Sequence, residues 1–200
     1  MQRICLVFTL LFSVSLFAQT NLSEREVRSL LGDFPAEGTA LEKRDDDILM
    51  NYQHTRTQQD CDKAASQESV DFRNFFQAPA GPLTAQEVKA LEKKMEDAGK
   101  QASQSSRFAK NLYQRPRPYQ RNSAIHPCIR MESSYSYPSG HTTISRVWAR
   151  LLSRIHPERA ADFLRISDAV AENRVIGGVH HPSDIEAGKK LGDAIAEKMP

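Results

Sequence analysis

The chain has 200 residues, 40% of them hydrophobic and 26% charged, and a formal net charge of +2. Such values are ordinary for a globular protein, and this length suits one domain that can bury a core of its own. The sequence lacks a basic tract with interleaved aromatic residues, which excludes the usual signature of a nucleic-acid partner.

The N-terminal segment has the three parts of an export signal. Arg3 is basic, residues 4–17 are apolar, and Ala18 precedes a polar stretch. This pattern predicts a signal peptide over residues 1–18 and a mature domain over 19–200. An uncleaved membrane anchor is the alternative. No other segment approaches transmembrane length, so we expect a periplasmic or secreted protein with no stable membrane insertion after signal removal.

Apolar residues recur at helical spacing through most of the chain. The expected helices span residues 23–31, 40–55, 68–77, 84–113, a range from Ser139 to just before Pro157, 158–176, and a final range that begins at Ser183. Two of them open with a capping-box pattern, Thr84-x-x-Glu87 and Ser183-x-x-Glu186. Gly99 weakens the long helix, and residues 119–138 form a loop. No apolar–polar alternation is long enough for a sheet, so the predicted fold is all-α.

Two groups of charged residues are interpreted as solvent-exposed rather than functional. They are Asp45, Asp46 and Asp47 in one run, and Arg146, Arg150 and Arg154 on one face of a helix. Three adjacent side chains on a helix point in different directions, which disfavours a cation site in the first group.

Two cysteines remain once the predicted signal peptide, with Cys5, is removed. An even pair in an oxidising compartment predicts a disulfide between Cys61 and Cys128. Two buried free thiols are the alternative, because the sequence does not establish that the two Cα atoms come close enough.

Three ordered blocks supply three cations, two imidazoles and one carboxylate. They are Lys110-x6-Arg117-Pro118, Pro138-Ser139-Gly140-His141 and Arg174-x5-His180-x3-Asp184. These groups can hold a phosphoryl group and attack it without a metal or other cofactor. The chain offers no cluster of carboxylates that would complete a two-metal site.

The first two blocks have the chemistry of anion binding. Lys110 offers a point charge and Arg117 a planar fork. Ser139 and Gly140 open a helix whose free backbone N–H groups bind anions, and His141 would point toward the same anion. Each residue also has an ordinary explanation: a lysine at a helix end, an arginine in a turn, and a capping serine beside a surface histidine.

The third block has the spacing of an oriented nucleophile. Asp184 can bind one ring nitrogen of His180 and leave the other free to attack. His181 is adjacent, but only His180 keeps the three-residue gap to Asp184. The alternative is a pair of loop histidines, with Asp184 as a helix-stabilising charge.

The ordered blocks resemble the signature of the type 2 phosphatidic acid phosphatase superfamily. Residues 136–142, Ser-Tyr-Pro-Ser-Gly-His-Thr, are most similar to the class A bacterial non-specific acid phosphatases. The match covers residues 110–184, with a fainter likeness over 47–57. Asn173 departs from the usual Ser before the Arg, and Tyr135 from a common Gly. The resemblance implies a helical bundle of the acid phosphatase and vanadium haloperoxidase type.

The resemblance also implies an exported, metal-independent phosphomonoesterase that acts on small phosphate monoesters. In that family pattern His180 forms a phosphohistidine, Asp184 orients it, and His141 protonates the leaving alcohol and then helps activate water. The phosphate oxygens are held by Lys110, Arg117, Arg174, the Ser139 hydroxyl and the Gly140 backbone.

Other functions use the same kind of pocket. A vanadium-dependent haloperoxidase binds vanadate where phosphate would sit, and a lipid phosphate phosphatase acts on a different leaving group. A phosphate-binding protein without activity is disfavoured, because binding alone does not require His180 paired with Asp184. The physiological substrate, the pH optimum and the oligomeric state, a homo-oligomer included, are not determined by the sequence.

Overall fold

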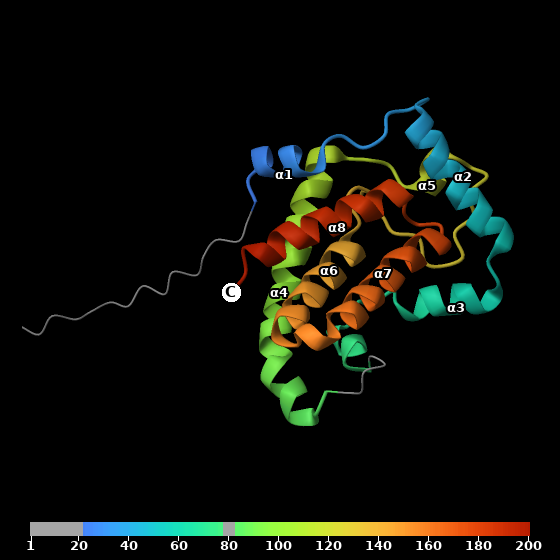
Figure 1. Ribbon diagram of the computed structural model, residues 1–200. Coiled ribbons are helices and arrows are strands. Elements are labelled where there is room, and N and C mark those ends of the chain that lie inside the picture. The colour runs from blue at the N-terminus through green and yellow to red at the C-terminus, as the bar shows by residue number, and fades with distance from the viewer. Residues whose placement is uncertain (1–21, 78–82) are drawn as a thin grey trace, which may run out of the picture.

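The computed structural model describes residues 22–77 and 83–200, so the predicted signal peptide lies outside the described residues. All regular elements in these ranges are helices, which confirms the all-α class (Figure 1). They are α1 Glu24–Leu31, α2 Ala40–Thr55, α3 Gln58–Ser66, η1 Phe72–Gln77, α4 Ala85–Tyr113, α5 Pro118–Arg121, α6 Gly140–Ile155, η2 Pro157–Arg159, α7 Ala160–Ile176 and α8 Pro182–Glu197. Within the described ranges, none of these helices combines the length and the apolar character needed to cross a bilayer.

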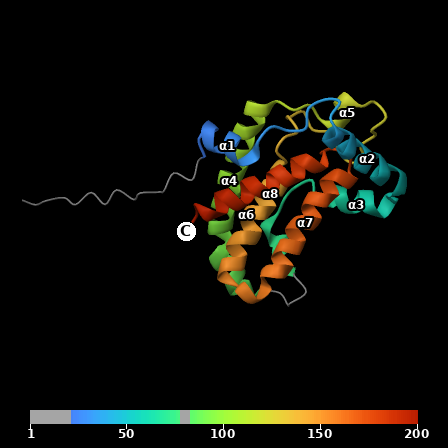
Figure 2. The same cartoon turned by 45° about the horizontal axis from the view of Figure 1, so that its top comes forward.

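Helix α6 is the centre of the packing and contacts α4, α7 and α8 (Figures 1 and 2). Its Trp148 packs edge-on against two phenylalanines. The Trp148 ring centroid lies 5.9 Å from that of Phe72 and 6.2 Å from that of Phe75. The indole N–H donates to the Met95 carbonyl of α4 at 2.7 Å. A Cβ at Gly99 would lie 2.7 Å from the Trp148 ring. Gly99 therefore lets α4 approach α6, and α4 continues through it as one helix.

The sequence predicts the long helices better than the short ones. Thr84 and Glu87 form the expected capping box of α4. In contrast, α3 is an additional helix, capped by Thr57 and Asp60. Residues 68–77 contain only the 3-10 helix η1. Pro118 begins the short helix α5, which extends into the expected loop of residues 119–138. Proline is well suited to this first helical position, because the N–H that it lacks would have no partner there.

The predicted capping box at the start of the final helix is wrong. Helix α8 begins at Pro182, and the Asp184 carboxylate accepts the backbone N–H of His181 at 2.8 Å. A Cβ at Gly188 would lie 2.8 Å from the Ser139 carbonyl oxygen, and the Ser139 N–H donates to the Asp184 carbonyl at 2.9 Å. The missing side chain at Gly188 thus allows the N-terminal ends of α6 and α8 to meet.

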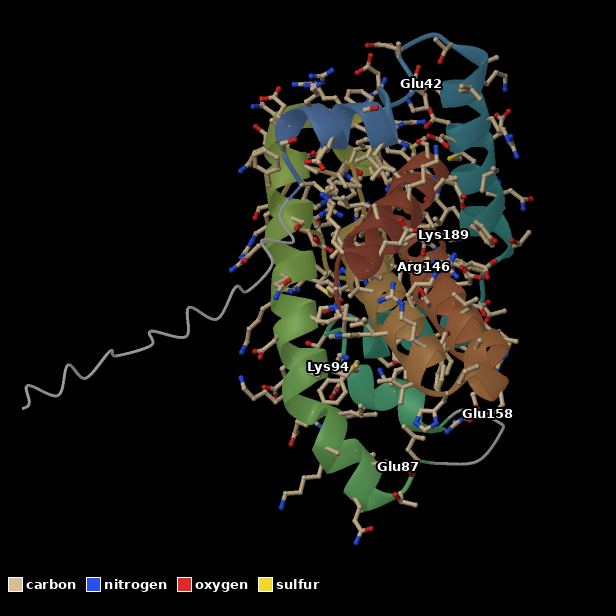
Figure 3. The ribbon with its side chains drawn as sticks, turned by 60° about the vertical axis from the view of Figure 1, so that its left-hand side comes forward. Glu42, Glu87, Lys94, Arg146, Glu158 and Lys189 are labelled. Atoms are coloured by element: carbon tan, nitrogen blue, oxygen red, sulfur yellow. A yellow bond between two sulfur atoms is a disulfide. The ribbon has the colours of Figure 1, made fainter. Side chains whose placement is uncertain are left out.

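The charged face of α6 is not simply solvated, which corrects the interpretation of two of its three arginines. Arg146 and Arg150 each pair with Asp193 of α8 at 2.7 Å. Arg146 and Lys189 lie near one another in Figure 3, and both pair with Asp168 of α7, at 3.7 and 3.2 Å. These ion pairs join α6, α7 and α8 near the surface of the protein.

Cys61 of α3 and Cys128 form a disulfide, with their Cα atoms 5.7 Å apart. The Cys128 N–H also donates to the Gly177 carbonyl, just after α7, at 3.1 Å. The bond therefore connects α3 to the long segment that leads from α5 to α6.

We expect the Cys61→Ser/Cys128→Ser double variant to be less stable than the wild type by about 4 kcal/mol, because the bond closes a long loop in the unfolded chain. The sequence separation of the two cysteines is 67 residues. Urea unfolding with and without a thiol reductant measures the effect. The reductant should destabilise the wild type and leave the double variant unchanged; equal sensitivity of both proteins would contradict the crosslink.

Candidate active site

The structure brings all eight predicted site residues to the neighbouring ends of four helices. Lys110 lies near the end of α4, Arg174 near the end of α7, and His180 and Asp184 on either side of the start of α8. Arg117 lies between α4 and α5. Ser139 caps α6, and Gly140 and His141 are its first residues. Apart from the partly exposed Gly140 and His141, these residues are buried.

The His180 ring is held from both sides. Its Nδ1 lies 3.1 Å from Asp184 Oδ2, and its Nε2 lies 3.0 Å from Nη1 of Arg117. Because a guanidinium group only donates hydrogen bonds, Nε2 is assigned as the acceptor and Nδ1 as the donor to Asp184. Burial, and then the charge of Arg117, lower the pKa of His180 well below its usual value. The ring is therefore neutral, with the lone pair of Nε2 on the side of Arg117.

Asp184 is fully buried and has four partners. It accepts hydrogen bonds from His180, from the Ser136 hydroxyl, from Arg115 Nη1 at 2.7 Å and from the His181 backbone at 2.8 Å. Burial alone would raise the pKa of Asp184, but the His180 hydrogen bond and the Arg115 charge hold it far below its usual value. The carboxylate therefore stays ionised and its orientation is fixed.

Arg115 and Asp45 extend this network, and sequence reasoning missed both. Arg115 is completely buried and bridges Asp184 to Asp45, whose Oδ2 lies 3.1 Å from its Nη2. Asp45 also accepts the Ser183 backbone N–H at 3.1 Å. The exposed-run interpretation is thus wrong for Asp45, although Asp47 is exposed and pairs with Lys43 at 2.7 Å.

His181 is buried but differently placed from His180. Its backbone N–H binds Asp184, while neither ring nitrogen has a hydrogen-bond partner within residues 22–77 and 83–200. Its Nδ1 lies 4.0 Å from Asp46, beyond hydrogen-bond distance. Of the two rings, only that of His180 forms a hydrogen bond to Asp184.

Lys110 is held by main-chain oxygens. Its Nζ donates to the Tyr135 carbonyl and, at 3.2 Å, to the Ser136 carbonyl. Burial, and then the charge of Arg117, lower the pKa of Lys110 to about 7. The Tyr135 contact uses the backbone, so the replacement of a common Gly by Tyr is compatible with it. Asn173, the other departure, donates to Gln67 at 2.7 Å and joins α7 to the residue after α3.

Arg117 and Arg174 converge on a residue that the sequence analysis did not select, Glu132. Arg117 Nη2 lies 2.6 Å from Glu132 Oε2, and Arg174 Nη2 lies 2.9 Å from Glu132 Oε1. Arg117 also donates to the Ser134 and Val179 carbonyls, each at 2.8 Å. Nothing in the local sequence distinguishes Glu132, because the contact depends on how the segment before α6 folds over the two arginines.

The start of α6 forms another side of the site. The Ser139 hydroxyl accepts the Thr142 N–H at 3.4 Å and the Thr142 hydroxyl at 2.9 Å. His141 Nε2 lies 2.9 Å from the Glu68 carbonyl, so Nε2 carries the ring proton in this arrangement. Burial, and then the charge of Arg174, lower the pKa of His141 to about 4.

A cavity of about 360 Å³ adjoins these groups and leads to the surface. Its lining residues are Glu68, Arg130, Met131, Glu132, Ser133, Ser134, His141 and Arg174. Among the described residues, no group of three or more His, Cys, Asp and Glu side chains is arranged to hold a metal ion. The charged side chains that line the cavity are two arginines, Arg130 and Arg174, and two carboxylates, Glu68 and Glu132.

The site thus places a histidine–aspartate pair beside three buried cations in an all-α fold. Residues 101–196 match the model of the PAP2 superfamily. This segment, just under half of the chain, contains every predicted site residue and is similar to the PAP2 superfamily.

Curated relatives agree with this similarity. A non-specific acid phosphatase from Providencia stuartii is 35% identical over 136 residues, which are 65% of this chain and 53% of the relative. One from Salmonella typhi is 39% identical over 90 residues, 42% of this chain and 35% of the relative. The chain thus spans about half or less of the length of these relatives.

Two solved structures share the fold at low sequence identity. A transmembrane PAP2-type phosphatidylglycerolphosphate phosphatase from Bacillus subtilis has a TM-score of 0.56 at 19% identity, over 80% of this chain and 85% of that one. A bacterial vanadium-dependent iodoperoxidase has a TM-score of 0.59 at 17% identity, over 88% of this chain and 54% of that one.

We expect Arg115→Gln to destabilise the protein by about 3–5 kcal/mol, because it leaves two buried carboxylates without their shared cation. Chemical denaturation at neutral pH measures this loss. Arg28→Gln is a suitable control, since Arg28 pairs with Glu24 at the surface and should matter little. A similar small effect for both variants would mean that Arg115 is not the main compensating charge of the network.

Proposed function

We propose that this protein hydrolyses phosphate monoesters through a phosphohistidine intermediate on His180. The observation that carries the proposal is the neutral His180 ring, fixed by Asp184 at Nδ1, with Nε2 directed toward the guanidinium of Arg117. A nucleophile held this close to cationic side chains can attack a phosphoryl group that those side chains bind.

In the first step, His180 Nε2 forms a bond to phosphorus as the bond to the ester oxygen breaks. The pKa of His141 is about 4 in the free site, and the negative charge of the bound phosphate ester raises it. Protonated His141 then transfers a proton to the leaving oxygen, and Asp184 stabilises the positive ring of His180. In the second step, neutral His141 accepts a proton from water as that water attacks phosphorus. The bond from phosphorus to nitrogen breaks, and phosphate leaves.

The cations supply the electrostatic part of the reaction. Lys110, Arg117 and Arg174 hold the equatorial oxygens, together with the backbone N–H of Gly140 and the hydroxyl of Ser139. Arg117 has two tasks in this scheme. In the free site its N–H group covers the lone pair of His180 Nε2, and on binding it turns to a phosphate oxygen and releases that lone pair.

The relatives named acid phosphatase support this reaction, although each aligns over about half or less of its length. The disulfide between Cys61 and Cys128 supports export to the periplasm or beyond, since such bonds persist in oxidising compartments. The similarity to the PAP2 superfamily and the three buried cations support small phosphate esters as substrates that need no divalent ion.

The nucleophile is tested by phosphate release from a panel of nucleotide, sugar and lipid monophosphates with a chelator present. We expect His180→Ala to reduce turnover by several orders of magnitude and to abolish the acid-labile phosphoenzyme, because nucleophile and orienting carboxylate act as a unit. Mass spectrometry after rapid quenching detects the intermediate.

His181→Ala is the matched control, since it removes the neighbouring imidazole and keeps the backbone N–H that binds Asp184. This variant should retain most of the activity. If the His181→Ala variant were inactive and the His180→Ala variant active, the assignment of the nucleophile to His180 would be wrong. Activity that disappears with chelator and returns with a divalent metal would overturn the metal-independent mechanism.

Anion binding should weaken as the pH rises through neutrality, because the pKa of Lys110 in the free site is about 7. Below that pH the Lys110 ammonium is charged and attracts an oxyanion; above it the amine is neutral. Sulfate is the probe, since it stays dianionic over this range, and its inhibition constant is measured from pH 5.5 to 8.5.

Lys110→Met provides the comparison for the pH profile. It should bind sulfate weakly at every pH and should lack the fall near neutrality that the wild type displays. The His141 pKa of about 4 lies below this window and leaves it undisturbed. A Lys110→Met profile parallel to that of the wild type would assign the fall to another group.

A further inference from the structure

Glu132 occupies the place between the two arginines where the proposed function requires phosphate. Each of its carboxylate oxygens accepts a hydrogen bond from one guanidinium group, Oε2 from Arg117 at 2.6 Å and Oε1 from Arg174 at 2.9 Å. A phosphate group also accepts hydrogen bonds from arginines through its oxygens, so it can bridge two guanidinium groups in the same way. A carboxylate and a phosphate cannot both take these donors.

The carboxylate fills this arrangement only in part. Arg174 is only 1% exposed. Its Nε and Nη1 are buried and have no hydrogen-bond partner within the described ranges. Unpaired buried donors of a charged group are costly. A tetrahedral oxyanion has oxygens in excess of the two that Glu132 offers, and these can reach the remaining donors.

We propose that Glu132 is an internal competitor for the phosphate site, and that an incoming phosphate group must displace its side chain from Arg117 and Arg174. Glu132 thereby sets the apparent affinity and favours oxyanions with more oxygens and more charge than one carboxylate. The inference rests on the proposed function, because it concerns the same pair of arginines.

The surroundings of Glu132 allow this displacement without unfolding of the segment. The Tyr119 hydroxyl donates to the Glu132 carbonyl at 2.6 Å and accepts the Glu132 N–H at 3.1 Å, so the backbone is fixed. The side chain is 23% exposed and lines the cavity of about 360 Å³ beside the site. Rotation about its side-chain bonds can therefore move the carboxylate into the cavity.

The competition persists over the working pH range. Burial alone would raise the pKa of Glu132, but the charges of Arg117 and Arg174 help to lower it to about 2. The side chain therefore remains a carboxylate in mildly acidic and neutral solution. The apparent dissociation constant of phosphate is the intrinsic constant divided by the fraction of molecules in which the site is vacant.

Calorimetric titration of the purified protein with inorganic phosphate tests the proposal. We expect Glu132→Gln, which keeps the size and removes the charge, to bind phosphate about 10-fold or more tightly than the wild type, as if the site were vacant in a tenth or less of wild-type molecules. The KM for a phosphate ester should fall in parallel. Thermal unfolding verifies that each variant is folded.

Two further variants separate occupancy of the site from the general effect of charge. Glu132→Asp keeps the charge but is too short to reach both arginines, so it should also bind phosphate more tightly than the wild type. Glu68→Gln removes a carboxylate from the same cavity wall, one that pairs with Arg130 at 3.6 Å, and should change the affinity much less.

Equal phosphate affinity in Glu132→Asp and the wild type, or an equal gain in Glu132→Gln and Glu68→Gln, overturns the competition. Loss of turnover in Glu132→Gln with no gain in phosphate affinity would make Glu132 a support for the arginines instead. Ester hydrolysis by the wild type in any of these cases leaves the proposed function standing, whereas its absence overturns that function separately.

Discussion

The whole site depends on one buried negative charge, that of Asp184. A carboxylate removed from water is stable only if hydrogen bonds and opposite charges replace its hydration. Asp184 obtains these from the His180 ring, the Arg115 guanidinium, the Ser136 hydroxyl and the His181 backbone. The same four contacts fix the His180 tautomer, cap α8 and attach the segment before α6. Stability and orientation are thus achieved by one set of bonds.

This arrangement explains which parts of the molecule can be predicted from the sequence. The period of apolar residues and the Thr84–Glu87 box are local signals, and the long helices α4, α6 and α7 follow from them. The spacing of His180 and Asp184 is also local, because both lie at the start of one helix. The predicted disulfide between Cys61 and Cys128 needed only the count of cysteines and an oxidising compartment, and the structure contains it.

Long-range partnerships could not be obtained in this way. Asp45 is one of three adjacent acidic residues, and only the packing of α2 beside α8 selects it as the partner of Arg115. Glu132 lies in irregular backbone, whose path no periodicity describes. Arg115 stands two residues before Arg117, yet it faces the buried carboxylates while Arg117 faces His180. Such alternation in a short connection is decided by tertiary contacts.

Several of the site's polar groups are positioned in part by main-chain carbonyls. Lys110 binds the carbonyls of residues 135 and 136, Arg117 those of residues 134 and 179, and His141 that of residue 68. A carbonyl is the same whatever side chain its residue carries. Residues 68 and 134 line the pocket. At positions 68 and 135 the side chain can therefore be exchanged while the carbonyl contact is kept, whereas Ser134 also accepts a hydrogen bond from Arg117 through its hydroxyl at 3.0 Å. Under the proposed function, positions 68 and 135 are the natural place for directed evolution to alter which alcohol the pocket accepts.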